Sequence, residues 1–209
     1  MINKDVLKEV MLSQRNFLDK LLVGIKRENE IKIRDSFATI ITGIRRAGKS
    51  TILNQILKKT KVGYYLNLED PRLDGFELTD FNKTEILMKE IYGNGGTYFF
   101  DEIQNVEKWE KFIRYLVDKK EKVVITGSNA SLLSRDLGAK LTGRYLQTEI
   151  FPFSFAEFLK IKKMSVSVNS FEKYLFMGGF PEYLKQNNPA ILQELLSNII
   201  MCEFFCCSL

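Results

Sequence analysis

The chain has 209 residues, of which 45% are apolar and 27% are charged. This composition is typical of a globular protein and excludes a disordered chain. A chain of this length buries roughly 70% of its unfolded surface, so it needs no disulfides to fold. Histidine is absent, which excludes Ser-His-Asp and Cys-His catalysis and every metal site that relies on imidazole.

The net charge of +5 permits an anionic partner without demanding one. No apolar run approaches the ~18 residues of a membrane span. The N-terminal sequence MINKDVLKEV is not typical of a signal peptide. We therefore expect a cytoplasmic protein that does not engage a membrane.

Short apolar runs alternate with helical spacing through the middle of the chain. The runs predict strands at residues 36–42, 62–68, 97–101, 123–126 and 145–150. The apolar spacing between them predicts helices at residues 49–59, 83–92, 109–116 and 131–137. Strands that alternate with helices predict an α/β fold with a parallel sheet covered on both faces.

The pattern changes at both ends of the chain. Residues 1–34 are charged and mixed, and they predict an N-terminal segment of one or two helices. After Pro152 only helical spacing remains, at residues 155–163, 171–177 and 190–201. We therefore expect an α/β core over residues 35–151 and a helical part over residues 152–209. All three cysteines follow Met201 in an apolar ending, which predicts a reading frame truncated or shifted there.

The strongest motif is GIRRAGKS at residues 43–50, which fits G-x-x-x-x-G-K-[ST] at every fixed position. Gly43 and Gly48 allow the backbone to fold closely around phosphates. The loop N–H groups and the helix N-terminus then face phosphate oxygens. Lys49 would contact the β- and γ-phosphates, and Ser50 would offer its hydroxyl to Mg²⁺.

Four neighbours complete the expected nucleotide-binding set: Arg45, Arg46, Ala47 and Thr51. The motif does not determine the roles of the two arginines. They could be exposed, contact phosphate or face a partner.

Two carboxylates end the apolar strand at residues 97–101. Asp101 could hold Mg²⁺ beside the phosphate loop, and Glu102 could orient or deprotonate the attacking water. Acidic pairs are common in turns, so the alternative for Glu102 is a solvated turn carboxylate. Their position about 50 residues after a phosphate loop favours the functional interpretation.

The strand at residues 123–126 ends in small polar residues. In a parallel sheet these emerge at the same edge as Lys49 and Asp101. Ser128 and Asn129 are near-equal candidates for positioning the water or contacting the γ-phosphate. The alternative is an N-cap for the following helix, and both roles can hold at once.

Together these residues resemble the AAA+ ATPases, and more narrowly a bacterial and archaeal AAA+ family whose members usually carry a C-terminal domain of unknown function. The resemblance covers about residues 30–200 and is carried by GIRRAGKST, YYLNLEDPRL, YFFDEIQNVEKWE, ITGSNASLLS, LTGRYLQTEIFPFSFAEFL and GGFPEYL. It implies a P-loop NTPase core with a five-stranded parallel sheet, a small helical lid at residues 152–209, and ATP with Mg²⁺ as ligands. It also implies that Glu102 is the catalytic glutamate and that Asn129 or Ser128 is the sensor.

The same resemblance draws attention to Arg144, which precedes the fifth predicted strand. Many AAA+ proteins place there an arginine finger that reaches the γ-phosphate of a neighbouring subunit, which would imply a homo-oligomer. The alternative is an arginine paired on its own subunit's surface. No arginine follows Arg144, so a lid arginine of the second-sensor kind is absent, and Lys185 would be a poor bidentate substitute.

The expected function is Mg²⁺-dependent ATP hydrolysis that drives a conformational change on an unidentified partner, either DNA or protein. The alternative is a nucleotide-dependent switch with negligible turnover, which the missing lid arginine favours. A small-molecule kinase shares the phosphate loop but lacks a substrate-pocket signature. The charge permits nucleic-acid binding, although no recognised DNA-reading motif is present.

Overall fold

The computed structural model describes residues 1–21, 24–28, 30–127, 141–186 and 188–200. The helix predicted at residues 131–137 and the ending from Met201 lie outside these ranges. Ser128 and Asn129 also lie outside them. Within the described residues, no helix combines the length and the apolar character needed to cross a bilayer.

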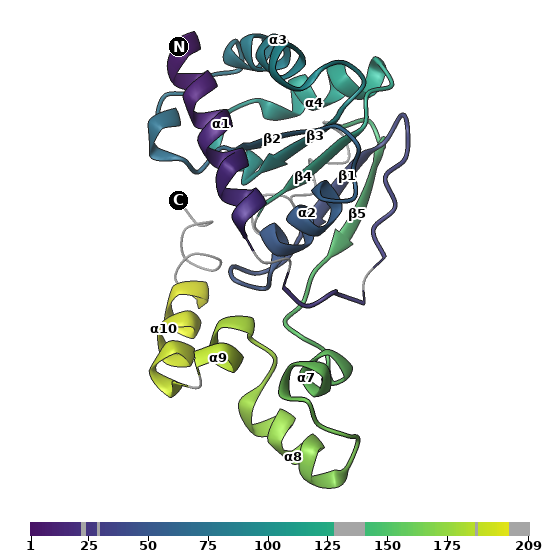
Figure 1. The fold of residues 1–209 in the computed structure, drawn as a ribbon, viewed down its shortest axis with the longest axis vertical. Coiled ribbons are helices and arrows are strands. Elements are labelled where there is room, and N and C mark those ends of the chain that lie inside the picture. The colour runs from purple at the N-terminus through teal and green to yellow at the C-terminus, as the bar shows by residue number, and fades with distance from the viewer. Residues whose placement is uncertain (22–23, 29, 128–140, 187, 201–209) are drawn as a thin grey trace.

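A five-stranded sheet forms the centre of the molecule (Figure 1), as the alternating pattern predicts. Its order is β2-β3-β4-β1-β5, and every neighbouring pair is parallel. The strands are β1 (Ala38–Thr42), β2 (Gly63–Asn67), β3 (Thr97–Asp101), β4 (Val123–Thr126) and β5 (Tyr145–Glu149). Strand β4 therefore lies between β1 and β3, although it follows both along the chain.

Helices cover both faces of the sheet, which explains why the inner strands are continuous apolar runs. One face, which carries Tyr98 and Phe100, packs against α3 (Asp80–Tyr92) and α4 (Trp109–Asp118). The opposite face, which carries Phe99, packs against α2 (Lys49–Leu57). Because successive strand residues point to opposite faces, neighbouring aromatic residues belong to different layers of the core.

Helix α1 (Lys4–Lys20) is the single helix that the structure describes before β1, and it packs beside the edge strand β2. Its Leu7 and Met11 are fully buried in the same core as the sheet. The Gln14 side chain accepts a hydrogen bond from the Asn67 backbone N–H at 2.8 Å and donates to its carbonyl at 3.0 Å. Gln14 thus satisfies backbone groups of β2 that lack a neighbouring strand.

After β5 the structure describes four helices, which lie at one end of the molecule (Figure 1): α7 (Phe155–Lys162), α8 (Val168–Met177), α9 (Pro181–Gln186) and α10 (Pro189–Ile200). They share a small apolar core that includes Phe153 and Phe158. Helix α9 was not predicted, because six residues are too few to show helical periodicity. Helices α3 and α8 each begin three residues earlier than their apolar spacing indicates.

The burial of α1 leads to a stability prediction. Replacing the fully buried Met11 with alanine removes apolar contacts and leaves a cavity, which should lower the free energy of unfolding by about 2–5 kcal/mol. The neighbouring Leu12 is 39% exposed, so Leu12→Ala should cost less than about 1 kcal/mol. Urea unfolding of both variants measures the difference, and equal losses would contradict the packing of α1 described here.

A second prediction concerns Asp80, which is fully buried at the start of α3. Burial alone would raise its pKa, but hydrogen bonds from Lys83 and from the backbone N–H groups of Glu77 and Ile2 hold the pKa below its ordinary value. A carboxylate with a lowered folded-state pKa stabilises the fold above its unfolded pKa of about 3.9. This stabilisation is lost as pH falls through the lowered value.

We therefore expect Asp80→Asn to flatten the loss of unfolding free energy below about pH 4. Urea unfolding over a series of pH values checks this expectation. Profiles that stay parallel for the parent chain and the variant would show that Asp80 contributes nothing to acid sensitivity.

Candidate functional site

The loop between β1 and α2 has a backbone that requires its glycines. Gly43 has φ 147°, and a Cβ atom there would lie 2.3 Å from the Ile150 carbonyl oxygen. Gly48, with φ 102°, occupies the N-cap position of α2 and offers no capping side chain. The first N–H groups of α2 are therefore left for an anion or for water, and the helix dipole favours an anion.

Lys49 is buried beneath this loop. Its ammonium group donates hydrogen bonds to the carbonyl oxygens of Gly43 at 2.9 Å and Ile44 at 3.3 Å. The side chain therefore lies along the inside of the loop, and its charge is placed where the motif predicts that phosphates bind.

Asp101 ends β3 and is 1% exposed. Burial raises the pKa of its carboxyl group, and hydrogen bonds from Thr126, Ser50 and Tyr65 partly oppose the rise. The Thr126 hydroxyl donates to Oδ1, and the Tyr65 hydroxyl donates to Oδ2 at 3.2 Å. Burial in turn raises the pKa of Tyr65 far above its ordinary value, so its hydroxyl remains a donor.

The strand order explains why these groups meet. In the sheet register, Ile41 of β1 lies opposite Thr126 of β4. Strand β4 thus brings a hydroxyl between the phosphate loop that follows β1 and the carboxylate that ends β3. All of these groups stand at the carboxyl edge of a parallel sheet, where ligands bind in open α/β folds.

Glu102 has a backbone that few residues other than glycine adopt. Its φ of 52° and ψ of 50° are left-handed, a conformation that costs a non-glycine residue roughly 1–3 kcal/mol. The backbone N–H of Glu102 donates to the Thr126 hydroxyl at 3.1 Å, and its carboxylate accepts a hydrogen bond from Gln104 at 2.6 Å. Thr126 therefore holds both acidic residues at once.

The two loop arginines point to other parts of the chain. Arg45 lies 3.5 Å from the Glu69 carboxylate, and Arg46 lies 2.6 Å from Glu182 on α9. Each arginine side chain is about half exposed. Arg46 thus contacts the helical part after β5 of its own chain, a partner that the motif did not indicate.

The remaining loop residues differ in accessibility. Ala47 is fully buried, and its carbonyl accepts a hydrogen bond from Arg27 at 2.9 Å. Thr51 is exposed on α2 and lines a cleft of about 830 Å³ together with Ser50 and Asp101. The two metal residues predicted from the sequence, the exposed Ser50 and the buried Asp101, therefore line one cleft.

Arg144 lies at the opposite edge of the sheet. Its carbonyl accepts from the N–H of Ala38, the first residue of β1, whereas the phosphate loop follows the last residue of that strand. Its exposed guanidinium pairs with Asp118 at the end of α4. Arg144 therefore does not reach the phosphate loop of its own chain. The sensor candidates Ser128 and Asn129 fall outside the described residues.

Reasoning from the sequence missed Thr126, Tyr65 and Gln104. The sequence partly indicated Thr126, because it is the last residue of a strand that ends in polar residues. Nothing in the sequence indicated Tyr65, which is one aromatic residue in an apolar strand. Within the described ranges no cluster of three or more Cys, Asp or Glu side chains could hold a metal by itself. A metal at Ser50 and Asp101 would need phosphate or water oxygens to complete its coordination.

Fold and site together define a P-loop NTPase of the α/β class. A family model described as an AAA domain matches residues 35–159, and the chain belongs to this family. An uncharacterized protein of Methanocaldococcus jannaschii is 37% identical in an alignment 214 positions long, which covers 96% of this chain and 48% of that protein. An uncharacterized protein of Haemophilus influenzae is 32% identical in an alignment 217 positions long, which covers 93% of this chain and 51% of that protein.

Among solved structures, AMPPCP-bound DnaA from Aquifex aeolicus superimposes with a TM-score of 0.49 at 12% sequence identity. The superposition covers 98% of this chain and 66% of the DnaA chain. The chain spans about half the length of the two relatives described above.

The position of Thr126 leads to a third prediction. Thr126→Val keeps the side-chain shape but removes the hydroxyl that Asp101 and the Glu102 N–H both use. Leaving buried polar groups unpaired should lower the free energy of unfolding by about 1–3 kcal/mol. Thr126→Ser keeps the hydroxyl and should cost clearly less. Chemical unfolding distinguishes the two variants, and an equal loss in both would mean that the methyl group, not the hydroxyl, stabilises the site.

Proposed function

We propose that the chain binds ATP with Mg²⁺ at the loop formed by residues 43–51 and hydrolyses it. The observation that carries the proposal is the meeting of Lys49, Asp101 and Glu102 at one sheet edge, with Thr126 bonded to both acidic residues. A glycine-rich loop alone would bind phosphate. A second, acidic group beside it suits phosphoryl transfer to water.

In this proposal the residues divide the work by their chemistry. The loop N–H groups and Lys49 bind the phosphates, and the oxygen atoms of Ser50 and Asp101 are the hard ligands that Mg²⁺ prefers. Mg²⁺ bound there would neutralise phosphate charge. Glu102 accepts a proton as water forms a bond to the γ-phosphorus, while the bond from that phosphorus to the ADP oxygen breaks.

The wider function is also part of the proposal. We infer that hydrolysis changes the conformation of a DNA or protein partner in the cytoplasm. Arg144, exposed and remote from its own phosphate loop, would act on a neighbouring copy in a homo-oligomer. Asn129 or Ser128, which follow the β4 residues in the sequence, would sense the γ-phosphate. The family supports these assignments, and the exposed position of Arg144 away from its own phosphate loop supports its role in a neighbouring copy.

A second candidate is a nucleotide-dependent switch with negligible turnover. One observation favours it: the sequence has no arginine after Arg144 that could reach the γ-phosphate from the helical part. In addition, the Glu102 carboxylate is already engaged by Gln104. A switch would keep nucleotide binding and lose only the water-activating step.

The fourth prediction separates these candidates. Lys49→Ala should weaken Mg²⁺-ATP binding at least tenfold, because the loop loses its only lysine beside the phosphates. Glu102→Gln should keep binding and lower turnover by about 10²–10⁴-fold, because the general base is removed. Lys59 is exposed in the turn after α2, so Lys59→Ala serves as a control for loss of a nearby lysine. Binding is measured with a fluorescent ATP analogue, and turnover by phosphate release.

Each outcome has a clear meaning. Turnover in the parent chain that both variants lose supports the ATPase. Binding without turnover in the parent chain supports the switch. Absence of binding in the parent chain, or equal behaviour of Lys49→Ala and Lys59→Ala, contradicts both.

A further inference from the structure

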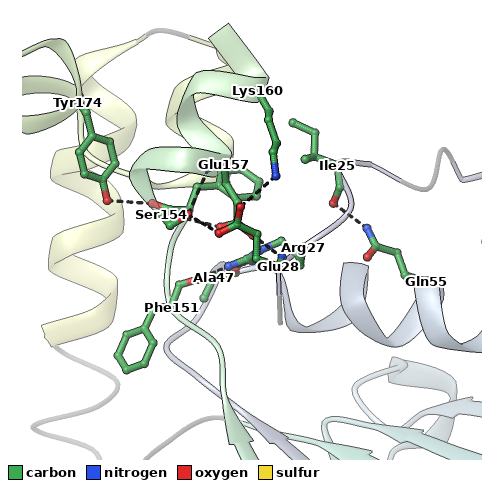
Figure 2. A network of polar contacts seen from close by, with 11 residues as sticks. Ile25, Arg27, Glu28, Ala47, Gln55, Phe151, Ser154, Glu157, Lys160 and Tyr174 are labelled. Atoms are coloured by element: carbon green, nitrogen blue, oxygen red, sulfur yellow. Dashed lines mark hydrogen bonds and ion pairs between the residues drawn. The ribbon is translucent and has the colours of Figure 1, made fainter. Parts of the chain in front are cut away.

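A buried ion pair lies between the phosphate loop and the helical part after β5 (Figure 2). Arg27, from the segment that precedes β1, donates from Nε to Glu157 Oε1 of α7 at 2.7 Å. Arg27 is 7% exposed and Glu157 is 2% exposed. A charge pair with so little access to water stabilises a protein only where hydrogen bonds satisfy its remaining polar atoms.

The Arg27 guanidinium uses each of its nitrogen atoms on a different segment. Besides the Glu157 contact, Nη1 donates to the Ala47 carbonyl of the phosphate loop at 2.9 Å, and Nη2 donates to the Phe151 carbonyl at 2.7 Å. Phe151 belongs to the linker between β5 and α7. The planar, forked shape of arginine allows one side chain to hold three acceptors that lie in different directions.

Glu157 is equally constrained on the helical side. Its carboxylate accepts from the backbone N–H groups of Ser154 at 2.9 Å and Glu28 at 3.1 Å, in addition to Arg27. Ser154 and Glu157 form the capping box that begins α7. The residue that receives the guanidinium therefore also determines where α7 starts.

On the loop side the guanidinium packs directly against the nucleotide-binding backbone. A Cβ atom on Gly48 would lie 3.2 Å from Arg27 Nη1, so the contact is at the residue before Lys49. The guanidinium also stacks over the ring of Phe153, 4.9 Å from its centre, in the core of the helical part. The other link that we describe between loop and helices, Arg46 to Glu182, is half exposed and correspondingly weaker.

We propose that Arg27 is a positioning residue that fixes the phosphate loop to α7, so that nucleotide in the loop determines the orientation of the helical part. A rearrangement of Ala47 and Gly48 around phosphates moves a guanidinium whose other bonds end on α7 and its linker. The coupling between nucleotide and the helical part passes through the loop backbone, so it does not require an arginine from the helical part that contacts the phosphate. It rests on the proposed nucleotide binding by the loop.

Two variants test the proposal without leaving an unpaired buried charge. Arg27→Lys keeps the charge beside Glu157, but a single ammonium group cannot hold all three acceptors in the forked geometry. The double variant Arg27→Gln with Glu157→Gln removes both charges together. Lys160→Ala is the matched control, because it removes only the exposed Lys160–Glu28 pair at the same interface.

Hydrogen exchange of the loop and of α7, with and without Mg²⁺-ATP, gives the direct readout. In the parent chain and in Lys160→Ala, we expect Mg²⁺-ATP to slow exchange in both segments. In the two Arg27 variants we expect slowing in the loop alone, and a dissociation constant for a fluorescent ATP analogue at least tenfold higher. If Arg27 had a purely structural role, the Arg27 variants would be less stable, but Mg²⁺-ATP would still slow exchange in both the loop and α7.

The outcomes distinguish this inference from the proposed function. Nucleotide-dependent slowing of α7 that survives in both Arg27 variants overturns the inference and leaves ATP binding intact. A parent chain that binds no Mg²⁺-ATP overturns the proposed function. In that case hydrogen exchange without nucleotide still tests whether Arg27 fixes the loop to α7. The loop and α7 should both exchange faster in Arg27→Lys than in Lys160→Ala, and equal exchange rates would overturn this link.

Discussion

A carboxylate buried at the end of a central strand is the constraint on which the site depends. Asp101 has almost no access to water, and burial opposes its ionisation. Hydroxyl groups from the two flanking strands, Thr126 on β4 and Tyr65 on β2, partly satisfy it. A cation beside Ser50 would favour the ionised form further. The hydroxyl groups that offset the burial of Asp101 thus also hold its carboxylate in a position that suits a metal-assisted phosphate site.

The phosphate loop is defined as much by its surroundings as by its own residues. Gly43 is required by its close approach to the Ile150 carbonyl and by its backbone angle, whereas Gly48 is required by its backbone angle and lies beside Arg27. Through these approaches the loop contacts the chain just after β5, at Ile150, and in the segment before β1, at Arg27. The segment before β1 therefore takes part in building the site, and it joins the loop to α7 through one buried guanidinium.

The local pattern of the chain anticipated the architecture well. Apolar runs separated by helical spacing predicted five parallel strands with helices on both faces, and β3 and β4 have the predicted bounds. The motif placed Lys49 at the first residue of α2, and the end of an apolar strand located Asp101. The sequence did not predict the partners of Arg45 and Arg46, because both are exposed. An exposed arginine pairs with whichever acidic side chain the folded chain places near it.

The sequence by itself determined the class of fold and the loop predicted to bind phosphate, because both depend on contiguous stretches with fixed periodicity or spacing. Only the tertiary structure decided which groups support them. Thr126 lies between the loop and Asp101 because β4 inserts between β1 and β3, an order that no local pattern encodes. Arg27 lies 20 residues from Ala47 and 130 residues from Glu157 along the chain. Such a contact exists only when the folded backbone brings distant segments together, because burying an arginine becomes favourable only once all its acceptors are in place.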